Sequence, residues 1–114
     1  MALKIASRDV NGVKVLDLSG QIVLGEGSVQ LREAVRGLIS KGTKKILLNM
    51  GDVNYIDSSG LGELVSAFTT AKNQQADVKL LKLTKKVHDL LQLTKLYTVF
   101  DIYDDEASAI ASFK

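Results

Sequence analysis

The residues of this chain that are best suited to chemistry are neighbours near its middle, in the stretch from Ile56 to Gly62, which reads IDSSGLG. It places a carboxylate, two hydroxyls and two glycines between an apolar run and an amphipathic run. Asp and Ser side chains accept hydrogen bonds from the free N–H groups at a helix start, and the partial positive charge there favours a phosphate. Glycines lack a Cβ, so another surface can approach their backbone closely. The stretch therefore predicts a turn that presents a hydroxyl and can carry a phosphate, with an ordinary Ser-capped strand-to-helix connection as the alternative.

Other combinations of residues do not support catalysis by this chain. A Ser-His-Asp hydrolase needs a base within reach of the serine, and nothing in the sequence directs the only histidine, His88, towards Ser58. The residues around Ser58 also lack the Gly-x-Ser-x-Gly pattern of a nucleophile elbow. Gly25-Glu26-Gly27 is a weak phosphate cradle, since it lacks the third glycine of a dinucleotide fingerprint and the lysine of a P-loop, and a flexible loop is the favoured interpretation. We expect neither an enzyme nor a bound cofactor or metal.

The composition indicates one globular domain, spanning residues 1–114. Hydrophobic residues make up 46% of the chain, too many for a disordered protein. The net charge is only +2, from 15 basic and 13 acidic residues, so direct binding to nucleic acid has little support. The chain has no cysteine, which excludes disulfides and thiolate chemistry. No signal peptide or bilayer-spanning run is evident, and we expect a cytoplasmic protein that is not inserted in a membrane.

The first part of the chain predicts an antiparallel hairpin. Leu3 to Arg8 alternates apolar and polar residues, and Asn11-Gly12 tolerates the positive φ angles of a tight turn. The second strand follows and is expected to end at Ser19-Gly20, with Gln21 to Leu24 as a short additional strand. Ser28, after a glycine loop, is the predicted N-cap of the next helix.

The remainder of the chain predicts helices and strands in alternation. The first expected elements are a helix ending at Lys41-Gly42, a buried strand at Ile46-Leu47-Leu48 and a turn from Gly51 to Asn54. A helix follows that closes at Asn73 and has its apolar face at Leu61, Leu64, Val65 and Phe68. The last expected elements are a strand from Asp77 to Leu83, a helix capped by Thr84, a strand from Tyr97 to Tyr103, and a final helix that starts with acids from Asp104 to Glu106. Such alternation implies parallel strands joined by right-handed crossovers. The fold class is therefore α/β: a mixed β-sheet, with the N-terminal hairpin at one edge and parallel strands after it, packed with about four helices.

At the stretch from Ile56 to Gly62 the chain resembles the STAS family, and within it the bacterial anti-sigma factor antagonists. The stretch matches the family's phosphorylation motif, Asp-Ser-Ser/Thr-Gly-Leu-Gly, without a departure. The resemblance extends over nearly the whole chain, including Leu18-Ser19-Gly20 and the alternating elements, and implies a single STAS-like domain. It also implies that Ser58, with Ser59 as its neighbour, is phosphorylated by an ATP-dependent serine kinase that is also the anti-sigma factor.

The resemblance implies partner switching. The unphosphorylated protein would bind the kinase and free a sigma factor or another target. The protein phosphorylated on Ser58 would dissociate from the kinase, and a PP2C-like phosphatase would remove the phosphate. The chain would then be a substrate and not an enzyme, with ATP and the general base belonging to the kinase. The residues expected to contact the partner lie in the motif and around the loop after the second strand: Asp57, Ser59, Gly60, Leu61, Gly62, Gln21, Gly25, Glu26 and Ser28.

One stretch departs from the family pattern. Family members often carry Gly-Glu-Leu/Ile-Asp after the second strand, whereas this chain has Gly20-Gln21-Ile22-Val23, with an amide and a valine in place of two acids. Any contact that those acids make with a kinase or a nucleotide therefore does not carry over, and the partner need not control a sigma factor. The loop from Gly25 to Ser28 is equally compatible with partner recognition and with a purely helix-capping role.

Two other functions are compatible with the sequence. One is a STAS-type accessory subunit of a membrane transport complex, or a sensor of a small ligand, which the near-neutral charge allows. The other is weak nucleotide binding or hydrolysis, which the glycine loop and Ser58 motivate but which no lysine-bearing phosphate loop supports. The sequence leaves the oligomeric state open.

Overall fold

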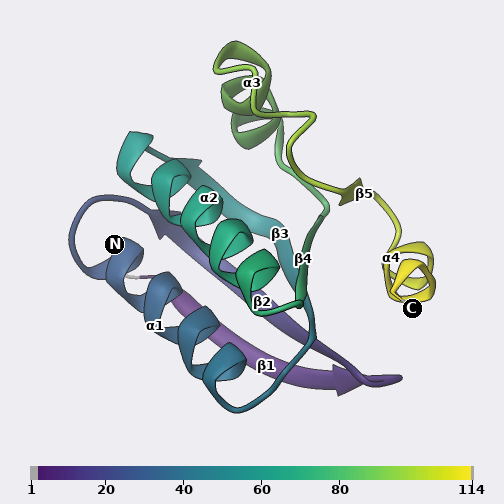
Figure 1. Ribbon diagram of the computed structural model, residues 1–114. Coiled ribbons are helices and arrows are strands. Elements are labelled where there is room, and N and C mark those ends of the chain that lie inside the picture. Colours follow the sequence, from purple (N-terminus) through teal and green to yellow (C-terminus); the bar gives the residue numbers. More distant parts are fainter. Residues whose placement is uncertain (1–2, 114) are drawn as a thin grey trace.

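The chain alternates strands and helices, as its sequence pattern predicts. A computed structural model describes residues 3–113 (Figure 1). The strands are β1 (Lys4–Val10), β2 (Val13–Ile22), β3 (Lys45–Ile56), β4 (Asp77–Leu81) and β5 (Ile102–Tyr103), and the helices are α1 (Glu26–Ser40), α2 (Ser58–Asn73), α3 (Lys85–Leu93) and α4 (Glu106–Ser112). The four helices and five strands of the described chain confirm the predicted α/β class.

The strands form one mixed sheet in the order β1-β2-β3-β4-β5. β1 and β2 are antiparallel, with a register that runs from Lys4 opposite Ser19 to Val10 opposite Val13. The tight turn between them uses positive φ angles at Asn11-Gly12, 50° and 82°. The neighbouring pairs from β2 to β5 are parallel. The prediction of an N-terminal hairpin at the edge of a parallel sheet is therefore confirmed.

The apolar side chains divide between the two faces of the sheet. α1 and α2 lie side by side over one face (Figure 1), and with alternate residues of the strands they enclose the larger core. Leu31 of α1, Leu64 of α2 and Leu48 of β3 all belong to this core. A smaller cluster on the opposite face joins α4 to the strands: Val13, Val15, Leu47, Leu81, Ala109, Ile110 and Phe113. Because side chains alternate along a strand, this division fixes which strand residues each helix can cover.

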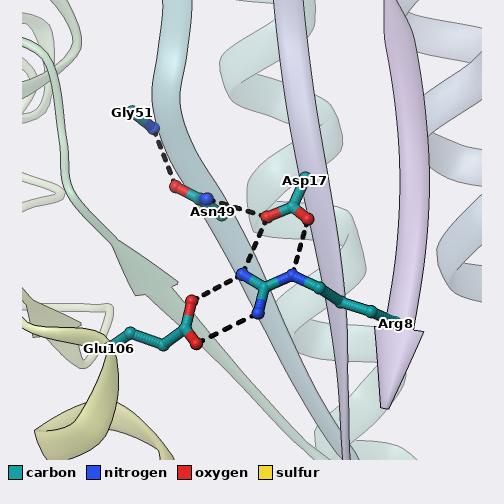
Figure 2. Close-up of polar contacts among 5 residues, drawn as sticks. All are labelled: Arg8, Asp17, Asn49, Gly51 and Glu106. Carbon is teal, nitrogen blue, oxygen red and sulfur yellow. Dashed lines mark hydrogen bonds and ion pairs between the residues drawn. The ribbon is translucent and has the colours of Figure 1, made fainter. Parts of the chain in front are cut away.

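A polar cluster on the second face connects α4 to the N-terminal hairpin (Figure 2). The guanidinium of Arg8 pairs with Asp17 through Nε at 2.7 Å and with Glu106 through Nη1 at 3.0 Å. Asn49 of β3 donates to the same Asp17 carboxylate at 2.8 Å. Arg8 of β1 therefore pairs with a residue of α4 that lies 98 positions away in the sequence.

The central strands are longer than predicted. β2 continues past Ser19-Gly20 to Ile22, and β3 runs through the stretch from Gly51 to Asn54, where the sequence predicts a turn. The two extensions pair with each other in parallel, Gln21 with Tyr55 and Ile22 with Ile56, after two irregularities in the register. Pairing between strands distant in sequence thus overrides the local turn signal, and it brings the ends of β2 and β3 together beside the motif.

Other boundaries also differ from the prediction. β4 ends at Leu81, and β5 contains only two residues, because the stretch from Tyr97 to Phe100 forms turns. These turns bury the Phe100 ring against Phe68, with 5.6 Å between ring centroids. Thr84 occupies the predicted N-cap position of α3, but its hydroxyl donates to the Val53 carbonyl at 2.9 Å and does not cap the helix. These side chains serve contacts between elements, which local pattern does not reveal.

Candidate functional site

The predicted motif forms the junction between β3 and α2. β3 ends at Ile56, α2 begins at Ser58, and Asp57 alone separates them. Asp57 has extended backbone angles and is the N-cap: its Oδ1 accepts the backbone N–H of Gly60 at 2.8 Å. The prediction of a capped turn is confirmed, and the capping residue is the aspartate and not a serine. The junction therefore presents the two serines on the first turn of α2.

Asp57 also connects the motif to the end of β2. Its Oδ2 accepts the backbone N–H of Leu24 at 3.0 Å, and its own N–H donates to the Ile22 carbonyl at 3.3 Å. The hydrogen bonds from the N–H groups of Leu24 and Gly60 lower the pKa of Asp57 below its ordinary value, because they stabilise the charged carboxylate. Asp57 is therefore ionised at neutral pH and holds two loops together.

The two serines of the motif have different surroundings. Ser58 is exposed, and within residues 3–113 its hydroxyl makes no hydrogen bond. Ser59 is half-buried, and its hydroxyl lies 3.2 Å from that of Ser28. The Ser28 hydroxyl donates to the Val23 carbonyl at 2.8 Å, and only 2% of Ser28 is exposed. Of the two serines of the motif, Ser58 is the one that presents a free hydroxyl to solvent.

The glycines of the motif have separate roles. A Cβ on Gly60 would lie 2.0 Å from the Ile22 carbonyl oxygen, so this glycine lets α2 approach the end of β2. The surface that comes close to Gly60 is therefore the end of β2 of the same chain, and a contact of Gly60 with a partner stays a prediction. Gly62 is exposed, and a Cβ there would meet nothing within 4 Å. Leu61 is buried in the core.

The predicted recognition loop lies beside the motif. α1 begins at Glu26, and Gly25 takes the N-cap position with a φ of 97°, which favours glycine. The prediction that Ser28 caps this helix is wrong, since Ser28 lies inside the first turn with its hydroxyl on Val23. Gly25 and Glu26 are exposed, whereas Gln21 is half-buried in β2 opposite Tyr55. The structure therefore brings the two predicted segments together, with Ser28 underneath the surface.

Three exposed apolar residues near the motif are not among the site residues that the sequence predicts. Leu24 is 78% exposed, although its N–H is bound to Asp57. Tyr55 and Leu93 are 44% and 80% exposed and border an open groove of about 410 Å³ lined by Tyr55, Ile56, Lys86, Asp89, Leu90 and Leu93. Exposed apolar surface rimmed by polar residues is typical of sites that bind other proteins. Their one signal in the sequence is that each lies outside the periodic core pattern.

The remaining groups that could support chemistry in the described residues include carboxylates and one histidine. Residues 3–113 contain no group of three or more His, Cys, Asp or Glu side chains that could hold a metal ion. The histidine, His88, packs against Tyr97 with 4.7 Å between ring centroids, and its Nδ1 lies 3.8 Å from Asp89. In the same part of the chain, no helix has the length and apolar character needed to cross a membrane.

The fold and the site define a small α/β domain whose capped polar turn lies at the carboxyl ends of parallel strands. Residues 4–109 match the family model of the STAS domain, and the chain belongs to that family. The anti-sigma-B factor antagonist of Bacillus subtilis is 33% identical to it over 92 residues, which cover 81% of this chain and 82% of the relative. The anti-sigma F factor antagonist of Paenibacillus polymyxa is 23% identical over 114 residues, 100% of this chain and 97% of the relative.

Solved structures share the fold. An anti-sigma factor antagonist from Mycobacterium paratuberculosis superposes with a TM-score of 0.85 at 18% identity, covering 97% of this chain and 93% of that one. The Bacillus cell fate determinant SpoIIAA in its phosphorylated form gives a TM-score of 0.76 at 19% identity, covering 97% of this chain and all of that one, 100%. At such identities the likeness establishes the fold alone.

Proposed function

We propose that this protein is an anti-sigma factor antagonist that switches partners through phosphorylation of Ser58. Unphosphorylated, it binds an anti-sigma factor that is also a serine kinase; phosphorylated, it is released. The observation that carries this proposal is the position of Ser58, whose free and exposed hydroxyl lies on the first turn of α2 directly after the ionised Asp57. Relatives that are anti-sigma factor antagonists support it.

The electrostatics of the turn explain how one phosphate can change binding and leave the fold intact. A phosphoserine adds about two negative charges, and the N-terminus of α2 offsets part of that charge. Asp57 already carries a negative charge beside it. At a protein interface, the added charge must be desolvated next to this carboxylate, which opposes association. The same phosphate in solvent costs the free protein little.

The partner surface that we propose surrounds Ser58. It consists of the exposed part of the motif, including Gly62, the loop at Gly25 and Glu26, and the apolar side chains of Leu24 and Tyr55. Leu24 is well suited to be an apolar anchor, since its backbone is fixed by Asp57 while its side chain stays exposed. Residues such as Ser28 and Gly60 contribute by shaping this surface from below.

The chain acts in this scheme as a substrate and not as an enzyme. Phosphoryl transfer needs ATP and a base that accepts the hydroxyl proton, and both belong to the kinase. A PP2C-like phosphatase removes the phosphate and resets the switch. We propose that residues 1–114 form one switching domain and that it acts in the cytoplasm, where its partners have ATP.

The proposal is tested with the kinase and ATP. The purified protein is incubated with candidate anti-sigma factor kinases and radiolabelled ATP, and the phosphate is mapped by mass spectrometry. We expect one phosphate, on Ser58, and no labelling of Ser58→Ala. Ser66→Ala, which changes a half-buried serine later in α2, is the matched control and keeps full labelling. Labelling that persists in Ser58→Ala would contradict the assignment of the acceptor.

A further inference from the structure

Two neighbouring serines start α2, and the structure treats their hydroxyls differently. Ser58 is exposed without a hydrogen bond among residues 3–113, whereas the Ser59 hydroxyl lies 3.2 Å from the buried Ser28. Both serines follow Asp57 on the same helical turn, so a charge at either one would lie near the same helix N-terminus. The dipole of the helix therefore does not distinguish them, and the contact with Ser28 does.

The hydrogen bonds around Ser28 have a defined direction. A serine hydroxyl has one proton to donate, and that of Ser28 goes to the Val23 carbonyl at 2.8 Å. Towards Ser59 the Ser28 oxygen can then only accept, so the proton of Ser59 points inwards to Ser28. The result is a chain from the Ser59 hydroxyl through the Ser28 hydroxyl to the Val23 carbonyl. It ends on the loop that carries the exposed Leu24.

We propose that Ser28 is a specificity-determining residue of the phosphorylation site, which withholds the Ser59 hydroxyl and so leaves Ser58 as the only acceptor. This inference rests on the proposed function, in which the turn is a kinase substrate. Ser28 acts on Ser58 only through its neighbour and does not touch the reacting atoms. It is therefore a positioning residue on α1 that serves a reaction on α2.

The chemistry of transfer explains why the buried contact matters. Transfer to Ser58 forms a bond from its Oγ to the γ-phosphorus of ATP, breaks the bond from that phosphorus to the bridging oxygen, gives the hydroxyl proton to the base of the kinase and releases ADP. The same step at Ser59 must first break its hydrogen bond to Ser28. The phosphoryl group would then replace the contact with the buried Ser28, at a position that has less access to water than Ser58.

An alternative explanation is that the kinase selects by position along the chain, one residue after Asp57. The two explanations predict different products when Ser28 changes. Ser28→Ala removes the acceptor for Ser59 but leaves the Val23 carbonyl paired, because the backbone N–H of residue 28 donates to it at 3.0 Å. This variant is therefore expected to fold, and it frees the Ser59 hydroxyl.

The first test uses the kinase and radiolabelled ATP of the labelling experiment. Four chains are compared: unchanged, Ser58→Ala, Ser28→Ala with Ser58→Ala, and Ser40→Ala with Ser58→Ala as the control on the exposed end of α1. We expect Ser58→Ala and the Ser40 double variant to stay unlabelled, and the Ser28 double variant to be labelled on Ser59 at ten times that background or more. An unlabelled Ser28 double variant overturns the proposal in favour of selection by position.

A second measurement needs no kinase and keeps the two proposals separate. Ser58→Asp and Ser59→Asp each place one carboxylate on the turn, and their thermal midpoints are compared by circular dichroism. We expect Ser59→Asp to melt about 4 °C or more below Ser58→Asp, because Ser59 is half-buried and the change removes the hydrogen bond between its hydroxyl and Ser28. In chains that also carry Ser28→Ala the difference should shrink. Equal midpoints overturn the role of Ser28, whereas failure to label the unchanged chain contradicts only the proposed function.

Discussion

The carboxylate of Asp57 accepts the backbone N–H of Leu24 at 3.0 Å, across 33 positions of sequence. This bond fastens the end of β2 to the turn that starts α2, and the Gly60 N–H occupies the other carboxylate oxygen. The aspartate of the motif is therefore a structural clamp as well as a source of charge. A change at this residue affects both the helix start and the loop that carries Leu24.

The clamp predicts a graded loss of stability. Asp57→Ala removes the acceptor of two backbone N–H groups and should lower the free energy of unfolding by about 1–2 kcal/mol. Asp57→Asn keeps one side-chain oxygen as an acceptor and should cost less than Asp57→Ala. It should still cost some stability, since its amide nitrogen cannot accept the second N–H. Urea denaturation with the same m value for all chains checks the order. Equal stability of the alanine variant and the unchanged protein would rule out the clamp.

The two glycines of the motif provide a matched pair. Gly60→Ala places a Cβ at 2.0 Å from the Ile22 carbonyl oxygen, a backbone atom that can move only with β2. We expect a loss of about 2–4 kcal/mol. Gly62→Ala lies in open space on the exposed face of the same helix and should stabilise the protein by about 0.5–1 kcal/mol. A similar loss in both variants would mean that backbone flexibility, and not close packing, explains Gly60.

The sequence predicts those features of the fold that depend on neighbouring residues. The hairpin at Asn11-Gly12, the capped start of α2 and the parallel strands after the hairpin all follow from local pattern. The extensions of β2 and β3 do not, because the residues from Gly51 to Asn54 resemble a turn and become a strand only through pairing with β2. Pairing with β2 stabilises the extended conformation of these residues, and the local sequence pattern does not indicate that pairing.

The site shows the same division. The motif predicts the turn and makes Asp57 a candidate N-cap, because both depend on the capping chemistry of neighbouring residues. The sequence predicts Ser28 as a helix cap, but Gly25 takes that place and leaves the Ser28 hydroxyl free to contact Ser59. A contact that joins residues 31 positions apart depends on how α1 packs against α2. Likewise, the residue type of Leu24 does not indicate that its side chain is exposed while its N–H binds Asp57.

The proposed switch predicts a separation of binding from stability. Ser58→Asp adds a negative charge beside Asp57 and should weaken binding of the kinase about tenfold or more. Its stability should change by no more than about 0.5 kcal/mol, since the side chain is exposed. Ser58→Asn has a similar size without the charge and serves as the control in isothermal titration calorimetry. If both variants bind as the unchanged protein does, charge at this position is not the switch.

Leu24 predicts a loss of binding without a loss of folding. Its side chain is 78% exposed, so Leu24→Ala removes little buried surface and should leave the midpoint of urea denaturation unchanged. If Leu24 is an anchor of the partner surface, the same change should weaken kinase binding about tenfold or more. Val99→Ala, at another exposed apolar residue that follows α3, is the comparison. Equal affinity of the two variants would remove Leu24 from the interface.

The cluster around Arg8 predicts a dependence on pH at the opposite face (Figure 2). The guanidinium lowers the pKa of Asp17 and that of Glu106 below their ordinary values, because it pairs with both carboxylates. A lowered pKa in the folded protein means that the stabilisation is complete above the pKa of the unfolded chain and is lost as the pH falls through the folded-state pKa. The attachment of α4 should therefore weaken in acid, below about pH 4.

Glu106→Gln tests this attachment. It leaves Arg8 paired with Asp17 alone and should lower the free energy of unfolding at pH 7 by about 0.5–1 kcal/mol, a modest value because the pair is partly exposed. Denaturation measured from pH 7 down to about pH 3 should show the difference from the unchanged protein shrinking towards zero, as protonation removes the same charge. Glu33→Gln, on the exposed side of α1, is the control and should show no difference at any pH. A difference that stays constant with pH would mean that Glu106 acts through packing and not through its charge.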